Sequence, residues 1–458
     1  MALQAVFERF KKKSPLTVMA RLLMQQALSR RWLDELFEEH RDQQYTRELL
    51  FSTVVDLMAL VALGLKPSLH AAAQASAELG VSLTALYDKV NRTEPAVVRA
   101  LVRGCGEKLT PVVQSMKAEQ TPWAAGYRVR VLDGNHLAAS EKRLKPLRGF
   151  RGGALPGQAL VVYAPEWDLV VDVVPAEDAH AQERALMGPV LEQVQQGELW
   201  LADRNFSTTG ILFAIEDKQA AFVIREHRVS PHPTEIGPTR EVGRVETGRV
   251  FEQAVQMEEK TGRQLMLRRV ELHLDEPTED GETVIRLLTN VPPERLGAQE
   301  VAGLYRRRWS IEGMFGRLES VLQSEVASLG NPRAALLAFG VSVMTYNILA
   351  VLQAAVETEH RVEAANVQVS TYYIADEVRS TYSGMMIAVP EAEWEPFETQ
   401  SAPELSQTLL RMAANINPAR LRKHPRKPKK KTKKGYVSGA EARRHVATAR
   451  VLRGQEFI

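Results

Sequence analysis

The stretch YRVRVLDGNH, residues 127–136, decides the fold because the spacing of its hydrophobic residues changes there. Val129 and Val131 alternate with arginines, and a period of two is typical of a β-strand with one buried face. The residues before this stretch recur at helical spacing instead. Because the strand pattern ends at Asp133, we expect a strand that carries a carboxylate to the edge of a sheet.

Four further segments downstream predict strands, with two helices among them. The strand segments are ALVVYAP, DLVVDVVP, ELWLADRNF and AAFVIRE, and the helices are predicted over residues 179–196 and 208–217. Three antiparallel strands, a crossover helix and further strands predict an α/β layer fold. In the ribonuclease H arrangement of this order, the fourth strand lies parallel to the first and beside it. We therefore assign residues 123–225 to the first part of a ribonuclease H-like core.

Residues 1–122 predict a helical N-terminal domain. Within it, LHAAAQASAELGVSLTALYDKVNR reads as two helices joined by a turn at Gly80, with Ser82 placed to cap the second. This layout fits a DNA-reading helix-turn-helix, in which Ser82, Thr84 and Lys89 are the candidate contacts. It fits plain packing in a helical bundle equally well, and both interpretations stay open.

The chain after residue 225 divides into four parts. Residues 226–292 hold short strand patterns bounded by turn residues, which predicts a β-strand insertion. Residues 293–360 would supply the second part of the core. They include Ala334–Val356, an uncharged stretch long enough to cross a bilayer, which we interpret as a buried core helix because it contains several polar residues. Residues 361–419 form a C-terminal region of mixed pattern, and residues 420–458 form a basic tail.

The charge of the chain is unevenly distributed. The net charge is +3, yet residues 420–434 contain ten lysines and arginines and no acidic residue, so the rest of the chain is net acidic. A basic tail on an acidic body indicates a polyanionic partner. We predict that Lys429, Lys430 and Lys431 contact DNA; the alternative is a tail that only improves solubility.

Composition also bears on the compartment. Cys105 is the single cysteine, so an internal disulfide is excluded, and the N-terminal residues lack the order of a secretory signal. We expect a reducing, cytoplasmic setting without a membrane partner.

Asp133 and Asp203 each close a predicted strand, in VLDGNH and LADRNF. If those strands are neighbours, both carboxylates emerge at the same edge of the sheet. Adjacent carboxylates raise each other's pKa unless a cation lies between them, and Mg²⁺ prefers such hard oxygen ligands. Either aspartate alone also fits a turn or a helix cap, as for the short helix after Asp203. The pair predicts a metal site.

The segment YRRRWSIEGMFGRLES, residues 305–320, predicts one helix with a buried apolar stripe. The stripe consists of Leu304, Ile311, Phe315, Leu318 and Leu322. Tyr305, Arg308 and Glu312 share an arc about 90° from the centre of the stripe, so they flank the buried face. The structural alternative is an ordinary Arg308–Glu312 pair, which would contribute only a few tenths of a kcal/mol.

These segments together resemble the DDE transposases of bacterial insertion sequences, in the insertion sequence four family. That family carries a Tyr, two residues, Arg, three residues, Glu, six residues, Lys signature around its catalytic glutamate, which Tyr305, Arg308 and Glu312 match. VLDGNH and LADRNF resemble the segments of its two catalytic aspartates. The chain departs from the signature at Glu319, where the family has lysine.

The resemblance implies a DNA transposase that cleaves the ends of its element and transfers them into target DNA. Asp133, Asp203 and Glu312 would be catalytic and would bind two Mg²⁺ or Mn²⁺ ions. The implied DNA contacts in this segment are Tyr305, Arg306, Arg307, Arg308 and Arg317. The implied partners are the terminal inverted repeats and target DNA, with a homodimer as the active complex, in the bacterial cytoplasm at the nucleoid.

Two other functions stay open. One is an inactive or repurposed transposase that only binds DNA, with Glu319 as a sign of drift. The other is a ribonuclease H-like nuclease that cleaves without joining. Glu183 and Arg184, where the family often has acidic and basic residues, are interpreted as a solvent-exposed helix face.

Overall fold

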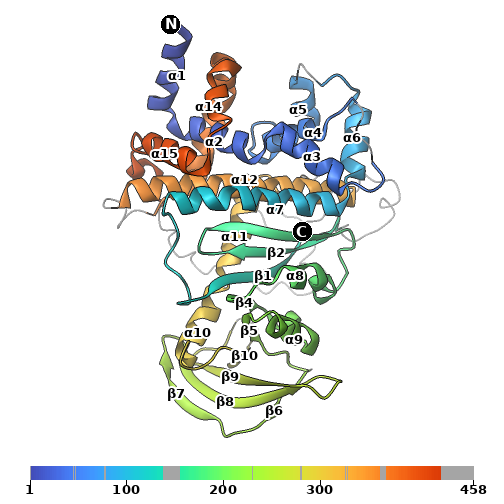
Figure 1. Cartoon of the computed structure of the whole chain (residues 1–458), viewed down its shortest axis with the longest axis vertical. Coiled ribbons are helices and arrows are strands. Elements are labelled where there is room, and N and C mark those ends of the chain that lie inside the picture. The colour runs from blue at the N-terminus through green and yellow to red at the C-terminus, as the bar shows by residue number, and fades with distance from the viewer. Residues whose placement is uncertain are drawn as a thin grey trace, which may run out of the picture.

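The computed structural model describes residues 2–44, 46, 48–76, 79–137, 155–229, 231–278, 281–324, 326, 328–361 and 368–423. These residues form a layer of helices at one end of a ten-stranded mixed sheet (Figure 1). Two long helices, α7 (Pro95–Ser115) and α12 (Pro332–Glu359), lie side by side between the other helices of the layer and the first strands.

Five strands form the part of the sheet nearest the helices. They are β1 (Arg128–His136), β2 (Gln158–Ala164), β3 (Leu169–Ala176), β4 (Glu198–Ala202) and β5 (Ala221–Arg225). The order is β3-β2-β1-β4-β5, in which β1 to β3 are an antiparallel meander and β4 and β5 run parallel to β1. The prediction that the fourth strand lies parallel to the first and beside it is confirmed.

The predicted β insertion continues this sheet. Its strands are β6 (Thr234–Glu235), β7 (Arg240–Val245), β8 (Gly248–Glu258), β9 (Gln264–Leu274) and β10 (Val284–Thr289). Strand β10 pairs antiparallel with β5, where Leu288 lies opposite Ile224. The hydrogen bonds of the core therefore run on without interruption into the insertion.

The remaining helices of the layer come from both ends of the chain. They are α1 (Ala2–Lys13), α2 (Pro15–Ala27), α3 (Arg30–His40), α4 (Phe51–Ala62), α5 (Leu69–Ala75), α6 (Leu83–Arg92), α14 (Thr371–Ala388) and α15 (Ala402–Ala413). Helix α12 contacts α2, α4, α6, α7, α14 and α15, so it is the common core of the layer.

Helix α12 is long and apolar enough to span a membrane, but 94% of its most apolar stretch is buried inside the protein. Its polar residue Asn347 explains why this helix belongs against the sheet. The Asn347 side chain accepts a hydrogen bond from Val170 N at 2.9 Å and donates one to Val170 O at 2.8 Å. Both backbone groups lie on β3, the end strand of the sheet, so the asparagine satisfies two polar groups that would otherwise be buried without partners.

The prediction of one helix over residues 305–320 is wrong. The chain forms α10 (Ala298–Arg307) and α11 (Ser310–Ser320), separated at Arg308 and Trp309. Around this junction the N–H groups of Arg308, Ile311 and Glu312 bond three residues back, not four, and such tight turns mark a break in an α-helix. The apolar stripe itself is confirmed, because Leu304, Ile311, Leu318 and Leu322 are buried and Phe315 is partly buried.

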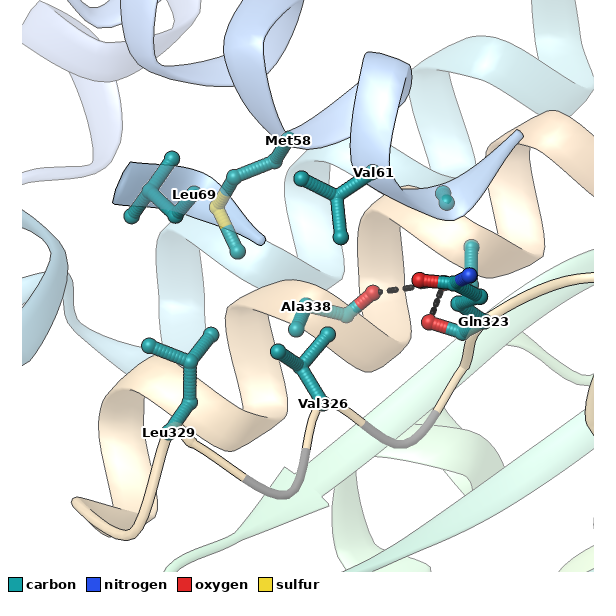
Figure 2. A pocket seen from close by; sticks show the side chains of 9 residues that line it. Met58, Val61, Leu69, Gln323, Val326, Leu329 and Ala338 are labelled. Atoms are coloured by element: carbon teal, nitrogen blue, oxygen red, sulfur yellow. Dashed lines mark hydrogen bonds between the residues drawn. The ribbon is translucent and has the colours of Figure 1, made fainter. Parts of the chain in front are cut away.

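The segment after α11 is fastened to the helical layer (Figure 2). Gln323 N donates to Ala62 O of α4 at 3.0 Å, and Gln323 O accepts from Ser342 Oγ of α12 at 3.5 Å. A cavity of about 10 Å³ remains between these elements, lined mainly by apolar side chains such as Met58 and Leu329. Since even one water needs at least about that volume, the packing here is close.

The predicted helix over residues 179–196 is much shorter than expected. A 3₁₀ turn, η2 (Glu183–Leu186), leads into α8 (Met187–Gln193), and residues before Glu183 are not helical. The helix over residues 208–217 is confirmed as α9 (Thr209–Asp217), which the Thr208 side chain caps.

Candidate active site

Asp133 and Asp203 occupy equivalent positions on the parallel pair β1 and β4. The last paired residues are Val131 and Leu201, and each aspartate lies two residues beyond its own member of that pair. Side chains two residues apart on a strand point to the same face. The two carboxylates therefore emerge on one face at one edge of the sheet, as the sequence predicted.

The strand of Asp133 extends further than the sequence indicated. It continues to His136 through pairing with β2, while its pairing with β4 has already ended. Asp133 thus lies where β1 and β4 separate, and this opening gives its carboxylate room.

Asp133 accepts two hydrogen bonds. Its Oδ2 accepts from Arg308 Nη1 at 2.8 Å, and its Oδ1 accepts from the N–H of Gly134 at 3.1 Å. Burial raises the pKa of the Asp133 carboxyl to about 6; the Arg308 guanidinium opposes this rise, and the Asp203 charge adds to it. A half-buried carboxylate with a raised pKa beside a second carboxylate is the environment that a bound cation would relieve.

Asp203 caps a short helix, as the sequence allowed, and it also lies near Asp133. Its Oδ1 accepts a hydrogen bond from Asn205 N at 2.8 Å, which caps the 3₁₀ turn η3 (Arg204–Phe206). The same residue faces Asp133 closely enough to influence its pKa. The cap and the site are therefore compatible.

Arg308 and Tyr305 lie behind the aspartates and are largely buried, at 7% and 5% exposure. The guanidinium of Arg308 lies over the Tyr305 ring at 5.7 Å. Burial raises the pKa of the Tyr305 hydroxyl to about 12, so it stays protonated near neutral pH. Among the described residues, the buried Nε of Arg308 has no hydrogen-bond acceptor. One donor of this guanidinium is therefore left for an acceptor that is not part of the described chain.

Glu312 lies apart from the two aspartates. It is exposed in the first turn of α11, a helix that packs against β1, and no described residue pairs with it. The described part of the chain contains no group of three or more His, Cys, Asp or Glu side chains close enough to hold a metal. The structure therefore brings two of the three predicted carboxylates together, and Arg308 pairs with Asp133 instead of Glu312.

The other predicted arginine contacts lie in different surroundings. Arg306 pairs with Glu246 at 3.2 Å, and the exposed Arg307 lies over the Trp123 ring at 5.9 Å. Arg317 pairs with Asp168 at 3.1 Å and also bonds the Tyr346 hydroxyl. These contacts fasten α10 and α11 to the rest of the protein.

The DNA contacts predicted in the N-terminal domain also lie in different surroundings. Ser82 Oγ accepts from Ala85 N at 3.2 Å and so caps α6, as predicted, and Thr84 is exposed. The Lys89 amine lies over the Phe37 ring at 4.2 Å, and burial lowers its pKa. Lys89 therefore points into the protein and not along an outer face. Lys429, Lys430 and Lys431 lie outside the described residues.

The sequence interpretation missed Glu183 and Asn205. Glu183 was expected on a solvent-exposed helix face, but its Oε2 accepts a hydrogen bond from Asn205 Nδ2 at 3.0 Å. Asn205 follows Asp203 by two residues in LADRNF, so its presence in that segment was the available signal. Arg184, by contrast, is exposed, and its side chain donates to that of its neighbour Gln182.

The residues present fit a divalent cation. The candidate ligand atoms are carboxylate oxygens, which Mg²⁺ and Mn²⁺ prefer. Asp133 carries the raised pKa that a cation would lower, and Arg308, which also interacts with the charge of Asp203, forms its ion pair with Asp133. Asp133 and Asp203 would be the principal ligands.

The fold and the site together define a class: an α/β protein with a carboxylate pair at the carboxyl ends of two adjacent parallel strands. Residues 124–348 match the family model of the transposase DDE domain. The match covers both aspartates, Arg308 and Glu312. Its description does not name the insertion sequence four family, so that narrower assignment stays a prediction.

One solved structure among those similar to the chain is the cryo-EM structure of a piggyBac transposase synaptic complex with hairpin DNA. It is 10% identical in sequence, with a TM-score of 0.39 over 88% of this chain and 86% of that chain. No curated protein sequence matches the chain.

Proposed function

We propose that the protein is a DNA transposase that cleaves the ends of a mobile element and joins them to target DNA. The observation that carries this proposal is the equivalent placement of Asp133 and Asp203 on β1 and β4, inside the matched transposase DDE domain. A ribonuclease H-like core is supported by the strand order, with three antiparallel strands followed by two parallel to the first. The insertion sequence four family is supported by the spacing of Tyr305, Arg308 and Glu312.

Asp133, Asp203 and Glu312 would hold two Mg²⁺ or Mn²⁺ ions. Such ions stabilise the attacking and leaving oxygens of an in-line displacement at phosphorus. The chain itself would bind and orient the DNA. Glu312, exposed and without a partner among the described residues, is free to serve as the third ligand from α11.

Arg308 would have two functions in this reaction. In the structure it neutralises part of the charge of Asp133 through the 2.8 Å pair. Its buried Nε, which has no acceptor among the described residues, would donate to a phosphate oxygen of bound DNA. Tyr305 packs against this guanidinium and would keep it in place.

A strand-transfer assay tests the proposal. The substrate would be a duplex carrying the inverted repeat that flanks the gene, supplied both intact and pre-cleaved, with Mn²⁺. The wild type should cleave the intact end and join the pre-cleaved end to target DNA. Asp133→Asn, Asp203→Asn and Glu312→Gln should lose both products and still shift the repeat in a gel. Cleavage without any joined product would indicate a nuclease that does not join DNA. Unchanged products with Asp133→Asn would overturn metal-dependent catalysis at this site.

A repurposed DNA-binding protein is the second candidate, and two observations favour it. Glu312 lies outside any three-carboxylate group in the described residues, and Glu319 replaces the lysine of the signature. The same assay separates the candidates, because such a protein would shift the repeat and form neither product.

The partners and setting are part of the proposal. We infer that the inverted repeats and target DNA are bound by a homodimer, in the bacterial cytoplasm at the nucleoid. The basic tail would add non-specific contacts to DNA through its lysines.

A further inference from the structure

Three short segments meet beside the two aspartates. They are the end of β1 after Asp133, the 3₁₀ turn η2 and the 3₁₀ turn η3, and the two turns contact each other. Glu183 is the first residue of η2, and its side chain reaches both of the other segments. A single side chain therefore bridges the elements that carry Asp133 and Asp203.

The first contact of Glu183 is with η3. Its Oε2 accepts a hydrogen bond from the side-chain amide of Asn205 at 3.0 Å. The backbone N–H of Asn205 in turn donates to Asp203 Oδ1 at 2.8 Å. Asn205 is thus held at both ends, by Glu183 through its side chain and by Asp203 through its backbone, and this fixes the turn in which the Asp203 carboxylate is oriented.

The second contact of Glu183 is with β1. A Cβ atom built at Gly134 would lie 1.9 Å from Glu183 Oε1 and 2.5 Å from Glu183 Cδ. No side chain fits at that distance, so only glycine lets the carboxylate rest directly on the strand next to Asp133. The backbone N–H of Gly134 also donates to Asp133 Oδ1. Glu183 consequently rests on the residue that orients Asp133.

We propose that Glu183 is a positioning residue that sets the Asp133–Asp203 pair for divalent cation binding, acting through Asn205 and Gly134. This inference rests on the proposed function of the aspartates as metal ligands. Partners of this kind orient ligating carboxylates, and their loss typically weakens metal affinity by about 10- to 100-fold. Glu183 acts here as a hydrogen-bond acceptor, so a neutral side chain with the same oxygen should replace it.

The test is a titration of Mn²⁺ into the full-length protein without DNA, followed by the electron paramagnetic resonance signal of free Mn²⁺. Glu183→Ala and Asn205→Ala should each weaken binding about tenfold or more. Glu183→Gln should bind within about threefold of the wild type. The double variant Glu183→Ala/Asn205→Ala should bind no more weakly than the weaker single variant, because both remove the same hydrogen bond.

Two further variants act as controls. Glu192→Ala removes an exposed glutamate from the neighbouring helix α8 and should leave Mn²⁺ affinity unchanged. Asp133→Asn should abolish binding, which shows that the titrated site is the proposed one. Thermal unfolding of each variant confirms that the protein is folded.

The outcomes separate the two levels of inference. Affinity of Glu183→Ala within twofold of the wild type would overturn the positioning role and leave the proposed metal site intact. Equal losses in Glu183→Gln and Glu183→Ala would also overturn it, because the charge and not the hydrogen bond would then matter. Absence of Mn²⁺ binding in the wild type, or undiminished binding in Asp133→Asn, would overturn the proposed function and this inference with it.

Discussion

Two neighbouring regions have opposite charge at the end of the sheet where Asp133 and Asp203 emerge. Over β1 and β4, the charges of Asp133 and Asp203 both act on the guanidinium of Arg308, and Glu183 lies beside them against Asn205 and Gly134. Over the neighbouring strands β5 and β10 the balance is reversed, with several arginines around one carboxylate. The members of this arginine cluster are Arg204, Arg225, Arg228 and their shared partner Glu282.

The boundary between the two regions falls between consecutive residues. Asp203 belongs to the acidic region, while Arg204 turns the other way and pairs with Glu282 at 3.1 Å. Under the proposed function, the carboxylates would hold a cation on one side, and the surplus positive charge would meet DNA phosphates on the other. This comparison can be tested residue by residue.

The largest expected effect comes from changing Asp203 and Arg204 separately. Asp203→Asn should lower the rate of DNA cleavage on the order of a thousandfold, because a metal ligand is lost, and leave DNA affinity nearly unchanged. Arg204→Ala should do the reverse, with weaker DNA binding and unchanged Mn²⁺ affinity. Cleavage rates, gel shifts and Mn²⁺ titration measure the three quantities. Parallel losses of all three in both variants would show that the two regions act as one.

A smaller effect is expected from the exposed member of the arginine cluster. Arg228→Ala should weaken DNA binding about tenfold and reduce the salt dependence of the binding constant by about one phosphate contact. Arg263→Ala is the matched control, since Arg263 is also an exposed, ion-paired arginine but pairs with Asp217 elsewhere. Equal losses in the two variants would mean that any surface arginine contributes.

Removing the charge of Glu282, the shared partner of the arginines, should strengthen DNA binding. Glu282→Gln leaves three guanidinium groups without their shared carboxylate, so DNA affinity should rise severalfold at low salt and converge with the wild type at high salt. Fluorescence anisotropy with a labelled duplex over a salt series measures this. Affinity that falls in Glu282→Gln would indicate that Glu282 is needed to shape the cluster.

The acidic region should also have a pH signature in the protein without metal. The pKa of Asp133 rises from an ordinary value of 3.8 to about 6 on folding, so the folded protein binds this proton more tightly than the unfolded chain. This contribution to stability is full below pH 3.8 and is lost as the pH rises through about 6, by at most about 3 kcal/mol.

Thermal unfolding in EDTA across that range should therefore show a fall in Tm of a few degrees that Asp133→Asn lacks. Above pH 6, Mg²⁺ should raise the Tm of the wild type and not that of Asp133→Asn. A wild-type Tm that follows the variant at every pH would show that Asp133 titrates normally.

The strand elements were predictable because their patterns are local. The alternation in residues 127–133 and the short strand before Asp203 located the two strands, and the ribonuclease H arrangement of that order predicted that they are neighbours, as they are. The break between α10 and α11 was not predictable, because Arg308 keeps helical propensity while a carboxylate far away in the sequence binds it. Long-range ion pairs of this kind have no period that a single sequence reveals.

The residues that the sequence interpretation missed also depend on contacts between distant parts of the chain. Glu183 looked like a surface residue because the predicted helix around it was too long, and the contact that assigns its role comes from Asn205. The arginine cluster also joins Glu282 to residues that lie far before it in the chain. Lys89 shows the opposite case, because a helix face that appears exposed in the sequence pattern is partly covered by Phe37.

The asparagine that satisfies β3 also limits how copies of this protein can meet. A sheet with a free end strand can recruit another copy edge to edge. Asn347 occupies the backbone groups of Val170 on that strand from inside the helical layer. A strand of another copy that paired with β3 at Val170 would have to displace Asn347, so this position of the strand is closed to such a contact.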